Sequence, residues 1–304
     1  MKNHRILFTG ITGTVARYIV PQLVENGCSI VGITRREAVS MPGVDMVSGA
    51  LDDPAFLDSV LNGADVVIHA AALTRSSNPQ KLKENNQDVT RHLVDASIAS
   101  NVKRFIFLSS DLAEDPLGPY GASKLACEDI ISSSALNDWV ILRLSPFLGG
   151  LECLGNSTFA QLILKIRNKQ KIWLPDGGKF QVAPIYGHDL VDLLRKVMEA
   201  DNKIRTTYAV SGPEGQLSDF LNMAATKMGA ELNIGNVPKP AIDLAVGLFD
   251  KIPGFNLPVF ESLKAIGRNL DQDKWADQLA RDFGFKAMDT SEMLDALLRE
   301  SADS

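Results

Sequence analysis

The hydrophobic pattern of the first 150 residues alternates between two periods. Short apolar runs of four to six residues, typical of buried strands, are each followed by a polar turn and then by apolar residues at helical spacing. The runs occupy residues 6–9, 29–34, 44–49, 65–69, 103–108 and 139–143. Strands that alternate with helices in this way predict an α/β fold with a doubly wound parallel sheet of the Rossmann type.

The pattern changes after residue 150, where segments become shorter and prolines and glycines more frequent. A late strand is predicted over 206–210, and helices over 189–198, 217–228, 240–250 and in further segments up to residue 298. We therefore expect a dinucleotide-binding domain over residues 1–150, to which a strand and helix return near 180–210. Residues 151–304 would form a smaller, mostly helical substrate lobe.

A turn rich in small residues joins the first strand to the first helix. Its two glycines allow a tight turn and a close approach to a pyrophosphate, which the free N–H groups and dipole of the helix N-terminus would bind. Ala16 takes the third small position, where the helix passes close to the strand. An ordinary strand-to-helix turn would carry the same pattern. The candidate cofactor contacts are Gly10, Thr12, Gly13, Thr14 and Val15.

The end of the second strand bears on the choice of cofactor. Arg35 and Arg36 stand there, and no acidic residue occupies the strand end. An acid would bind the ribose 2′-hydroxyl of NAD, whereas arginine favours the 2′-phosphate of NADP. A solvated basic loop is the alternative. We expect NADP as the cofactor, with NAD as the second choice.

Small residues also follow two other strands. Ala70, Ala71 and Ala72 come directly after the fourth strand, and Ser109 and Ser110 end the fifth. The alanines either leave room for a ligand against the backbone or are merely close-packed. Ligands of doubly wound sheets bind beyond the carboxyl ends of the strands, so the glycine turn, the alanines and the serines indicate a single site.

Tyr120 and Lys124 lie four residues apart at the start of the next predicted helix, on one helical face. The ammonium could lower the pKa of the phenol and still reach a cofactor ribose. Such a phenol could donate a proton to a carbonyl or accept one from an alcohol. A surface pair is the alternative when the spacing is considered alone.

Composition narrows the class of partner. The 304 residues carry a net charge of −6 without a contiguous Lys/Arg run, so we expect neither a nucleic-acid nor a membrane partner. Three cysteines and four histidines are scattered, which predicts no metal site and no disulfide framework. With no leader peptide or long apolar span evident, we expect a cytoplasmic protein.

Together, these motifs resemble the extended short-chain dehydrogenase/reductases of the NAD(P)-dependent epimerase/dehydratase group. The matching stretches are residues 9–16, 65–72, 105–110, 120–124 and 184–190, together with Asn86 in the preceding helix. The resemblance implies that Tyr120 is the acid/base, that Lys124 binds the ribose and activates Tyr120, and that Ser110 hydrogen-bonds the reacting oxygen, with Ser109 as the alternative. It also implies cofactor contacts at Leu51 and Pro146.

Three departures from the family pattern are visible. Only nine residues separate Ser110 from Tyr120, and Ala50 stands where Gly-Asp-Leu is usual, which leaves backbone groups near Leu51 for the adenine. Val182 stands where nucleotide-sugar enzymes often place an arginine on the substrate diphosphate. This last change disfavours a nucleotide-sugar substrate, although three other basic residues could serve instead: Arg75, Lys165 and Arg167.

Three functions remain open at this point. The first is net carbonyl reduction or alcohol oxidation of a small molecule, and the second is epimerase or dehydratase chemistry with transient reduction of the cofactor. The third is a dinucleotide-binding sensor or assembly subunit without turnover, against which the presence of Ser110, Tyr120 and Lys124 argues. We also expect a homodimer, formed through the apolar residues of helices near 89–99 and 126–131.

Overall fold

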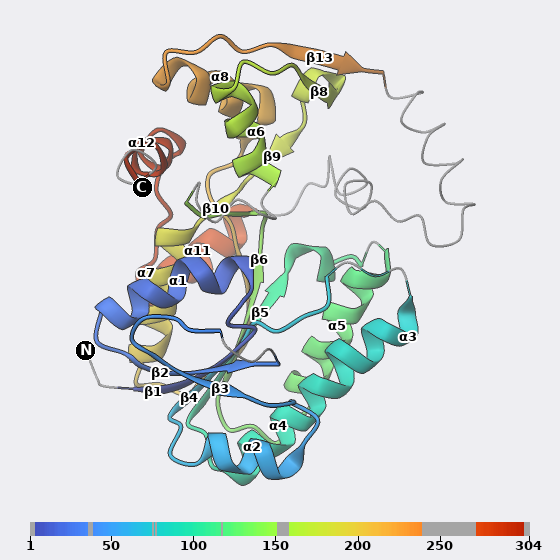
Figure 1. The fold of residues 1–304 in the computed structure, drawn as a ribbon, viewed down its shortest axis with the longest axis vertical. Coiled ribbons are helices and arrows are strands. Elements are labelled where there is room, and N and C mark those ends of the chain that lie inside the picture. The colour runs from blue at the N-terminus through green and yellow to red at the C-terminus, as the bar shows by residue number, and fades with distance from the viewer. Residues whose placement is uncertain are drawn as a thin grey trace.

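The computed structural model describes residues 4–35, 39–74, 76, 78–116, 118–150, 158–238 and 272–300. A sheet flanked by helices forms the larger part, and a lobe built from later segments lies at one end of the long axis (Figure 1). The helix predicted over 240–250 lies outside the described residues.

A seven-stranded sheet forms the centre of the larger part, with the strand order β11-β6-β5-β4-β1-β2-β3 and all neighbours parallel. This confirms the predicted doubly wound parallel sheet, and it shows that β11 from the second half of the chain completes one edge. The strands are β1 (Arg5–Thr9), β2 (Ser29–Thr34), β3 (Val44–Ser48), β4 (Val66–His69), β5 (Arg104–Ser110), β6 (Trp139–Leu144) and β11 (Arg205–Val210).

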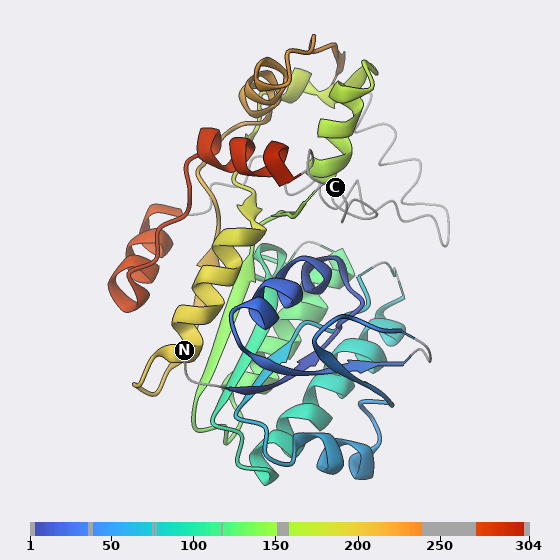
Figure 2. The same ribbon diagram turned by 60° about the vertical axis from the view of Figure 1, so that its left-hand side comes forward.

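Helices cover both faces of this sheet (Figures 1 and 2). One face carries α1 (Thr14–Glu25) and α7 (Gly187–Glu199), and the other carries α2 (Pro54–Leu61), α4 (Val89–Ala99) and α5 (Gly118–Ser132). Successive strand residues point to opposite faces. Accordingly, Ile6 and Phe8 belong to the core on one side of the sheet and Leu7 to the core on the other.

The stretch between β4 and β5, which includes the helix expected near 89–99, forms a long but interrupted helix. It consists of α3 (Pro79–Leu82), a π-helical turn η1 (Lys83–Asp88) and then α4. A π turn inserts one extra residue into the helix and often marks a functional position. Here the turn contains the buried Asn86.

The lobe beyond residue 150 contains more strand than expected, because three short two-stranded pairs accompany its described helices: β10–β7, β12–β9 and β13–β8. Its helices are α6 (Thr158–Arg167), α8 (Leu217–Lys227) and α12 (Thr290–Glu300), while α11 (Gln272–Phe283) packs beside α7 and β11. The strands are β7 (Phe147–Leu148), β8 (Ile172–Pro175), β9 (Gln181–Val182), β10 (Ile185–Tyr186), β12 (Gly215–Gln216) and β13 (Ile234–Val237), and short 3-10 turns are η2 (Asp111–Ala113) and η4 (Asp176–Gly178).

The described residues contain neither a membrane-spanning helix nor a cluster of metal-ligating side chains. None of their helices combines the length and the apolar character that a bilayer crossing requires. Within the same ranges, no three His, Cys, Asp or Glu side chains gather as metal ligands would.

Candidate active site

The glycine turn lies directly against the segment with the three alanines. Gly10 has φ +75°, and a Cβ built on it would lie 2.6 Å from the backbone nitrogen of Ala71 and 2.8 Å from the oxygen of Ala70. Only glycine fits this position, because both its φ and its contact with backbone atoms exclude a side chain. Two predicted parts of the cofactor site are therefore in contact.

The N-terminus of α1 is open to a ligand. Gly13 is its N-cap residue, in an extended conformation and without a side chain that could satisfy the first N–H groups. The Gly13 N–H donates to the carbonyl of Gly10 at 2.8 Å, which closes the turn. Thr12, Thr14 and Val15 are only partly buried. These are the features of an anion-binding helix start.

A buried histidine that the sequence analysis did not single out supports this edge of the sheet. His69 Nδ1 lies 2.7 Å from Thr9 Oγ1, and its Nε2 lies 3.0 Å from Thr90 Oγ1. Thr9 Oγ1 also accepts a hydrogen bond from the Ala71 N–H at 3.3 Å. Burial, followed by the charge of Lys124, lowers the pKa of His69 to about 3. The neutral ring thus joins β1, β4 and α4.

Asn86 connects the alanine segment to the helix that carries Tyr120. Its side-chain oxygen accepts from the Leu73 N–H at 2.7 Å, and its amide nitrogen donates to the Leu73 carbonyl at 3.1 Å. The same amide donates to Ser123 Oγ at 3.0 Å, and Ser123 donates to the Tyr120 carbonyl at 2.8 Å. The family asparagine noted in the sequence thus acts here as a clamp between two parts of the site.

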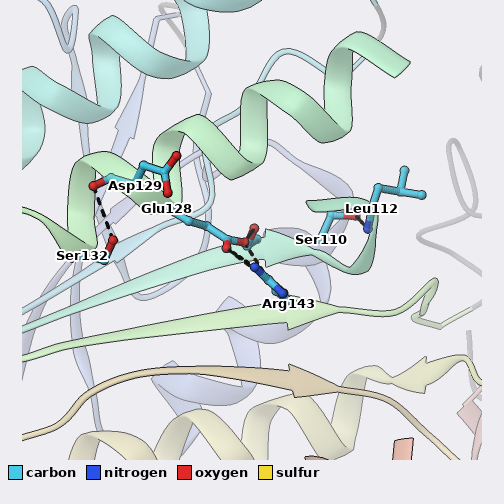
Figure 3. Close-up of polar contacts among 7 residues, drawn as sticks. Ser110, Leu112, Glu128, Asp129, Ser132 and Arg143 are labelled. Carbon is cyan, nitrogen blue, oxygen red and sulfur yellow. Dashed lines mark hydrogen bonds and ion pairs between the residues drawn. The ribbon is translucent and has the colours of Figure 1, made fainter. Parts of the chain in front are cut away.

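The two serines at the end of β5 have different partners, and Figure 3 shows Ser110 beside Leu112. Ser109 Oγ donates to Glu128 Oε1 at 2.5 Å, inside the protein. Ser110 Oγ donates to Asp111 Oδ1 at 3.1 Å and accepts from the Leu112 N–H at 3.3 Å, which caps η2. Ser109 is therefore engaged in the core, whereas Ser110 lies at the partly exposed strand end.

Glu128 is a second residue that the sequence analysis missed. It lies one turn beyond Lys124 on α5 and binds Arg143 of β6, with Arg143 Nη2 and Nε at 2.7 Å and 3.0 Å from Oε2 (Figure 3). The spacing of Tyr120, Lys124 and Glu128 is a signal that could have found it. The pair fixes α5 to the two strands beneath it.

Lys124 is buried and reaches into the sheet. Its Nζ donates to the Leu108 carbonyl at 2.7 Å and lies 3.9 Å from the centre of the Phe107 ring. Burial lowers its pKa to about 8, although Cys127 and Glu128 oppose this effect. The amine is therefore mostly protonated at neutral pH and titrates within reach of ordinary assays.

The phenol of Tyr120 does not have the lowered pKa that was expected from Lys124. Burial raises it first, and the negative charge of Asp111 and the Cys127 thiol raise it further. The expectation was wrong for this geometry because the Lys124 ammonium interacts with Leu108 and Phe107 instead. The connection that brings Asp111 near is the short one noted in the sequence, and a Cβ on Gly121 would lie 2.4 Å from the Leu112 carbonyl oxygen.

The remaining predicted cofactor residues lie at the same sheet edge or close to it. Arg35 is exposed after β2, and its Nη1 lies 3.4 Å from Asn85 Oδ1, while Arg36 lies outside the described residues. Leu51 packs at the border of one core, and Ala72 is partly buried. Pro146 is exposed after β6, and its carbonyl accepts from the Ile185 N–H at 3.1 Å.

The residues considered for a sugar diphosphate are more dispersed. Val182 is partly buried on β9 and pairs with Gly215 of β12. Lys165 and Arg167 are exposed in the last turn of α6, and Arg75 lies outside the described residues. Position 182 thus carries no cationic side chain, and Lys165 and Arg167 belong to a different element, α6.

Comparisons with known proteins agree with this geometry. The sequence model described as the NAD dependent epimerase/dehydratase family matches residues 6–211. The photosystem II assembly factor Ycf39 of Synechocystis is 27% identical over 240 residues, covering 77% of this chain and 71% of its own. The decarboxylating sterol-4-alpha-carboxylate 3-dehydrogenase of Dictyostelium discoideum is 26% identical over 265 residues, covering 77% and 78%.

Among solved structures, the Bordetella bronchiseptica enzyme WbmG, crystallised with NAD and UDP, superposes with a TM-score of 0.77 at 18% identity. The superposition covers 99% of this chain and 96% of WbmG. At this identity the likeness establishes the fold, including the position of the seven-stranded sheet.

Proposed function

Because the chain belongs to the NAD-dependent epimerase/dehydratase family, we propose that it is an NADP-dependent oxidoreductase that reduces a carbonyl or oxidises an alcohol. The observation that supports the proposal is the strand order. β5, which ends at Ser110 and is followed by α5 with Tyr120 and Lys124, is separated from β1, which runs into the glycine turn, by β4 alone, and these parallel strands end at the same edge of the sheet. A subunit that only binds a dinucleotide, without turnover, would not need a proton-transfer group, a buried amine and a serine at this edge.

The cofactor would lie across the carboxyl ends of β1, β2 and β4. Its pyrophosphate would bind at the open N-terminus of α1, which the φ of Gly10 and the extended Gly13 make accessible. Arg35 would hold the 2′-phosphate, and Lys124 would bind the ribose hydroxyls. The nicotinamide supplies or accepts the hydride, and the protein supplies the proton.

Tyr120 would pass that proton. Its raised pKa keeps the phenol protonated at neutral pH, which suits donation to a carbonyl oxygen as hydride arrives at the adjacent carbon. Ser110 would hydrogen-bond the same oxygen, and Ser109 is less suited to that role because its hydroxyl donates to Glu128. The reduced carbonyl leaves as an alcohol.

Net redox chemistry is favoured over nucleotide-sugar chemistry for two reasons. Val182 cannot bind a diphosphate, and the relative from Dictyostelium discoideum is named as a dehydrogenase of a sterol carboxylate. Net carbonyl reduction consumes NADPH, and net alcohol oxidation produces it, in proportion to product, whereas an epimerase restores its cofactor within each turnover. Absorbance at the nicotinamide band, followed during a screen of ketones, alcohols and nucleotide sugars, separates the two.

The cofactor preference can be tested separately by titration. The Arg35→Ala, Arg36→Ala double variant should lose most of the preference for NADP(H), and its NAD(H) affinity should remain close to that of the native protein. Tighter binding of NAD(H) than of NADP(H) by the native protein would contradict the assignment.

The Ycf39 relative supports a second candidate, a dinucleotide-binding assembly subunit. The two candidates differ in turnover. A protein that binds NADP(H) but shows no turnover in the screen would favour the assembly role, and an active protein would favour the enzyme.

A further inference from the structure

A series of exposed cations and one tryptophan lies on the substrate lobe, along the end of α6 and the segment that leads into β8. We call it the basic patch. It comprises Lys165, Arg167, Lys169, Lys171 and Trp173, all exposed. The first two end α6, and Trp173 is on β8. One residue of another type stands between each cation and the next, so the four cations do not form a contiguous Lys/Arg run.

Trp173 is held outward rather than in the core. Its side chain is 61% exposed, and among the described residues only Met223 on α8, at 36%, is another large exposed hydrophobic side chain. A Cβ on Gly235 would lie 2.4 Å from the indole ring, so the ring lies against the backbone of β13. Lys171 Nζ lies 4.3 Å from the ring centre. The fold therefore supports an apolar ring beside a cation at the surface.

The four cations form no ion pair with a described carboxylate. Elsewhere on the described surface cations do have partners, as Lys103 has Asp65 at 2.7 Å and Lys227 has Asp295 at 2.6 Å. The protein as a whole carries a net charge of −6. A local positive patch on a molecule with negative net charge orients that patch toward an anionic surface. The negative net charge disfavours non-specific binding through the rest of the molecule.

We propose that the basic patch docks the substrate lobe on an anionic lipid bilayer. Lysine and arginine are attracted to anionic headgroups, and tryptophan is favoured at the boundary between headgroups and acyl chains. α6 and β8 lie in the lobe at one end of the long axis, so docking there leaves the sheet and its cofactor edge in water (Figures 1 and 2). Such peripheral binding needs no spanning helix.

Single-stranded nucleic acid is a less suitable partner for this surface. Stacking on a base needs an accessible ring face, and here Gly235 and Lys171 both lie against the indole. The proposal does not depend on the reaction or its substrate, because docking is measured without either.

Vesicle flotation with the full-length protein tests the proposal. The protein should float with vesicles of phosphatidylcholine containing about 30% phosphatidylserine at low salt, and it should not float with phosphatidylcholine alone. The Lys169→Glu, Lys171→Glu variant should bind at least roughly 30-fold more weakly, because each lysine near the surface contributes about 1 kcal/mol. The matched control is Lys81→Glu, Lys203→Glu, which makes the same charge change at exposed lysines of the sheet domain and should bind as the native protein does.

Fluorescence reports the position of Trp173 independently. Brominated lipids should quench part of the native emission, and Trp173→Phe should remove that quenched part while thermal unfolding stays unchanged. Failure to bind anionic vesicles, equal binding to neutral ones, or equal loss in the control variant would overturn the proposal. So would tight binding to single-stranded nucleic acid or patch-dependent self-association without vesicle binding.

Discussion

The ionisation of Tyr120 is governed by its burial and its neighbours rather than by the lysine one turn away. Burial and the negative charge of Asp111 both raise the pKa of the phenol, and the amine of Lys124 is directed to the Leu108 carbonyl. A phenol with a raised pKa remains a proton donor through the neutral range. Under the proposed function, this favours proton donation to a carbonyl oxygen at neutral pH.

Removing the Asp111 charge should change the pH dependence. Carbonyl reduction needs a protonated phenol, so the rate falls as pH rises through the pKa of Tyr120. Asp111→Asn keeps an acceptor oxygen for Ser110 and lowers that pKa, so the fall should move to lower pH. A pH profile of kcat measures it, with Glu114→Gln as the control at an exposed position of the same connection. An unmoved profile, or a shift to higher pH, would count against the role of Asp111.

Gly10 allows a second comparison between single residues. Gly10 and Gly27 both have positive φ, +75° and +85°, but a Cβ on Gly27 would meet nothing within 4 Å. Alanine should cost about 1 kcal/mol of stability through backbone strain at Gly27, and more than that at Gly10, where the new Cβ would also clash with the backbone of Ala70 and Ala71. Gly10→Ala should also weaken NADPH binding at least tenfold, because it displaces the alanine segment, whereas Gly27→Ala should not. Equal affinities in a fluorescence titration would contradict this explanation of the turn.

At the scale of elements, the sequence predicted what local patterns can specify. The strands of the sheet were predicted because each is a short apolar run. α2 also has a local signal, because Asp53 caps it, accepting from the Ala55 N–H at 3.0 Å. The π turn was missed because helical periodicity continues through it. The pair between Glu128 and Arg143 was missed because its partners come from different elements: Glu128 continues the spacing of Tyr120 and Lys124, but no local pattern indicates Arg143.

This buried pair should be a main support of the catalytic helix. The side chains of Glu128 and Arg143 are 5% and 15% exposed, and Ser109 adds a further hydrogen bond. Glu128→Ala leaves a buried guanidinium unpaired and should lower the free energy of unfolding by about 3–5 kcal/mol. The control Lys83→Ala breaks an exposed pair with Asp88 and should cost less than about 1 kcal/mol. Urea denaturation compares them, and similar costs would refute the assignment.

At the scale of the whole molecule, the two halves of the chain interlock. β11 completes the sheet edge beside β6, and Tyr208 on it donates to Asp282 of α11 at 2.7 Å. Tyr18 of α1 donates to Glu300 of α12 at 2.8 Å. Residues before and after position 150 are therefore in contact through β6 and β11 and through α1 and α12. The apolar pattern of each half could not predict these contacts.

The expected homodimer stays a prediction, and its original reason needs revision. Leu93, Val94, Cys127 and Ile131 pack into the core beneath α4 and α5, so these apolar residues are not available to a partner. A dimer through these helices would use their more polar outer faces. Light scattering at micromolar concentration should give the mass of two chains, and the mass of one chain would reject the dimer.

The proposed reaction depends most directly on Tyr120, which would transfer the proton. Tyr120→Phe keeps the ring and its packing but removes the proton, so turnover of the substrate found in the nicotinamide screen should fall by roughly 10²–10⁴-fold. The affinity for NADPH, measured by titration of the same preparation, should stay close to the native value because the phenol contributes few cofactor contacts. Near-normal turnover with intact cofactor binding would contradict the assignment of Tyr120 as the acid/base.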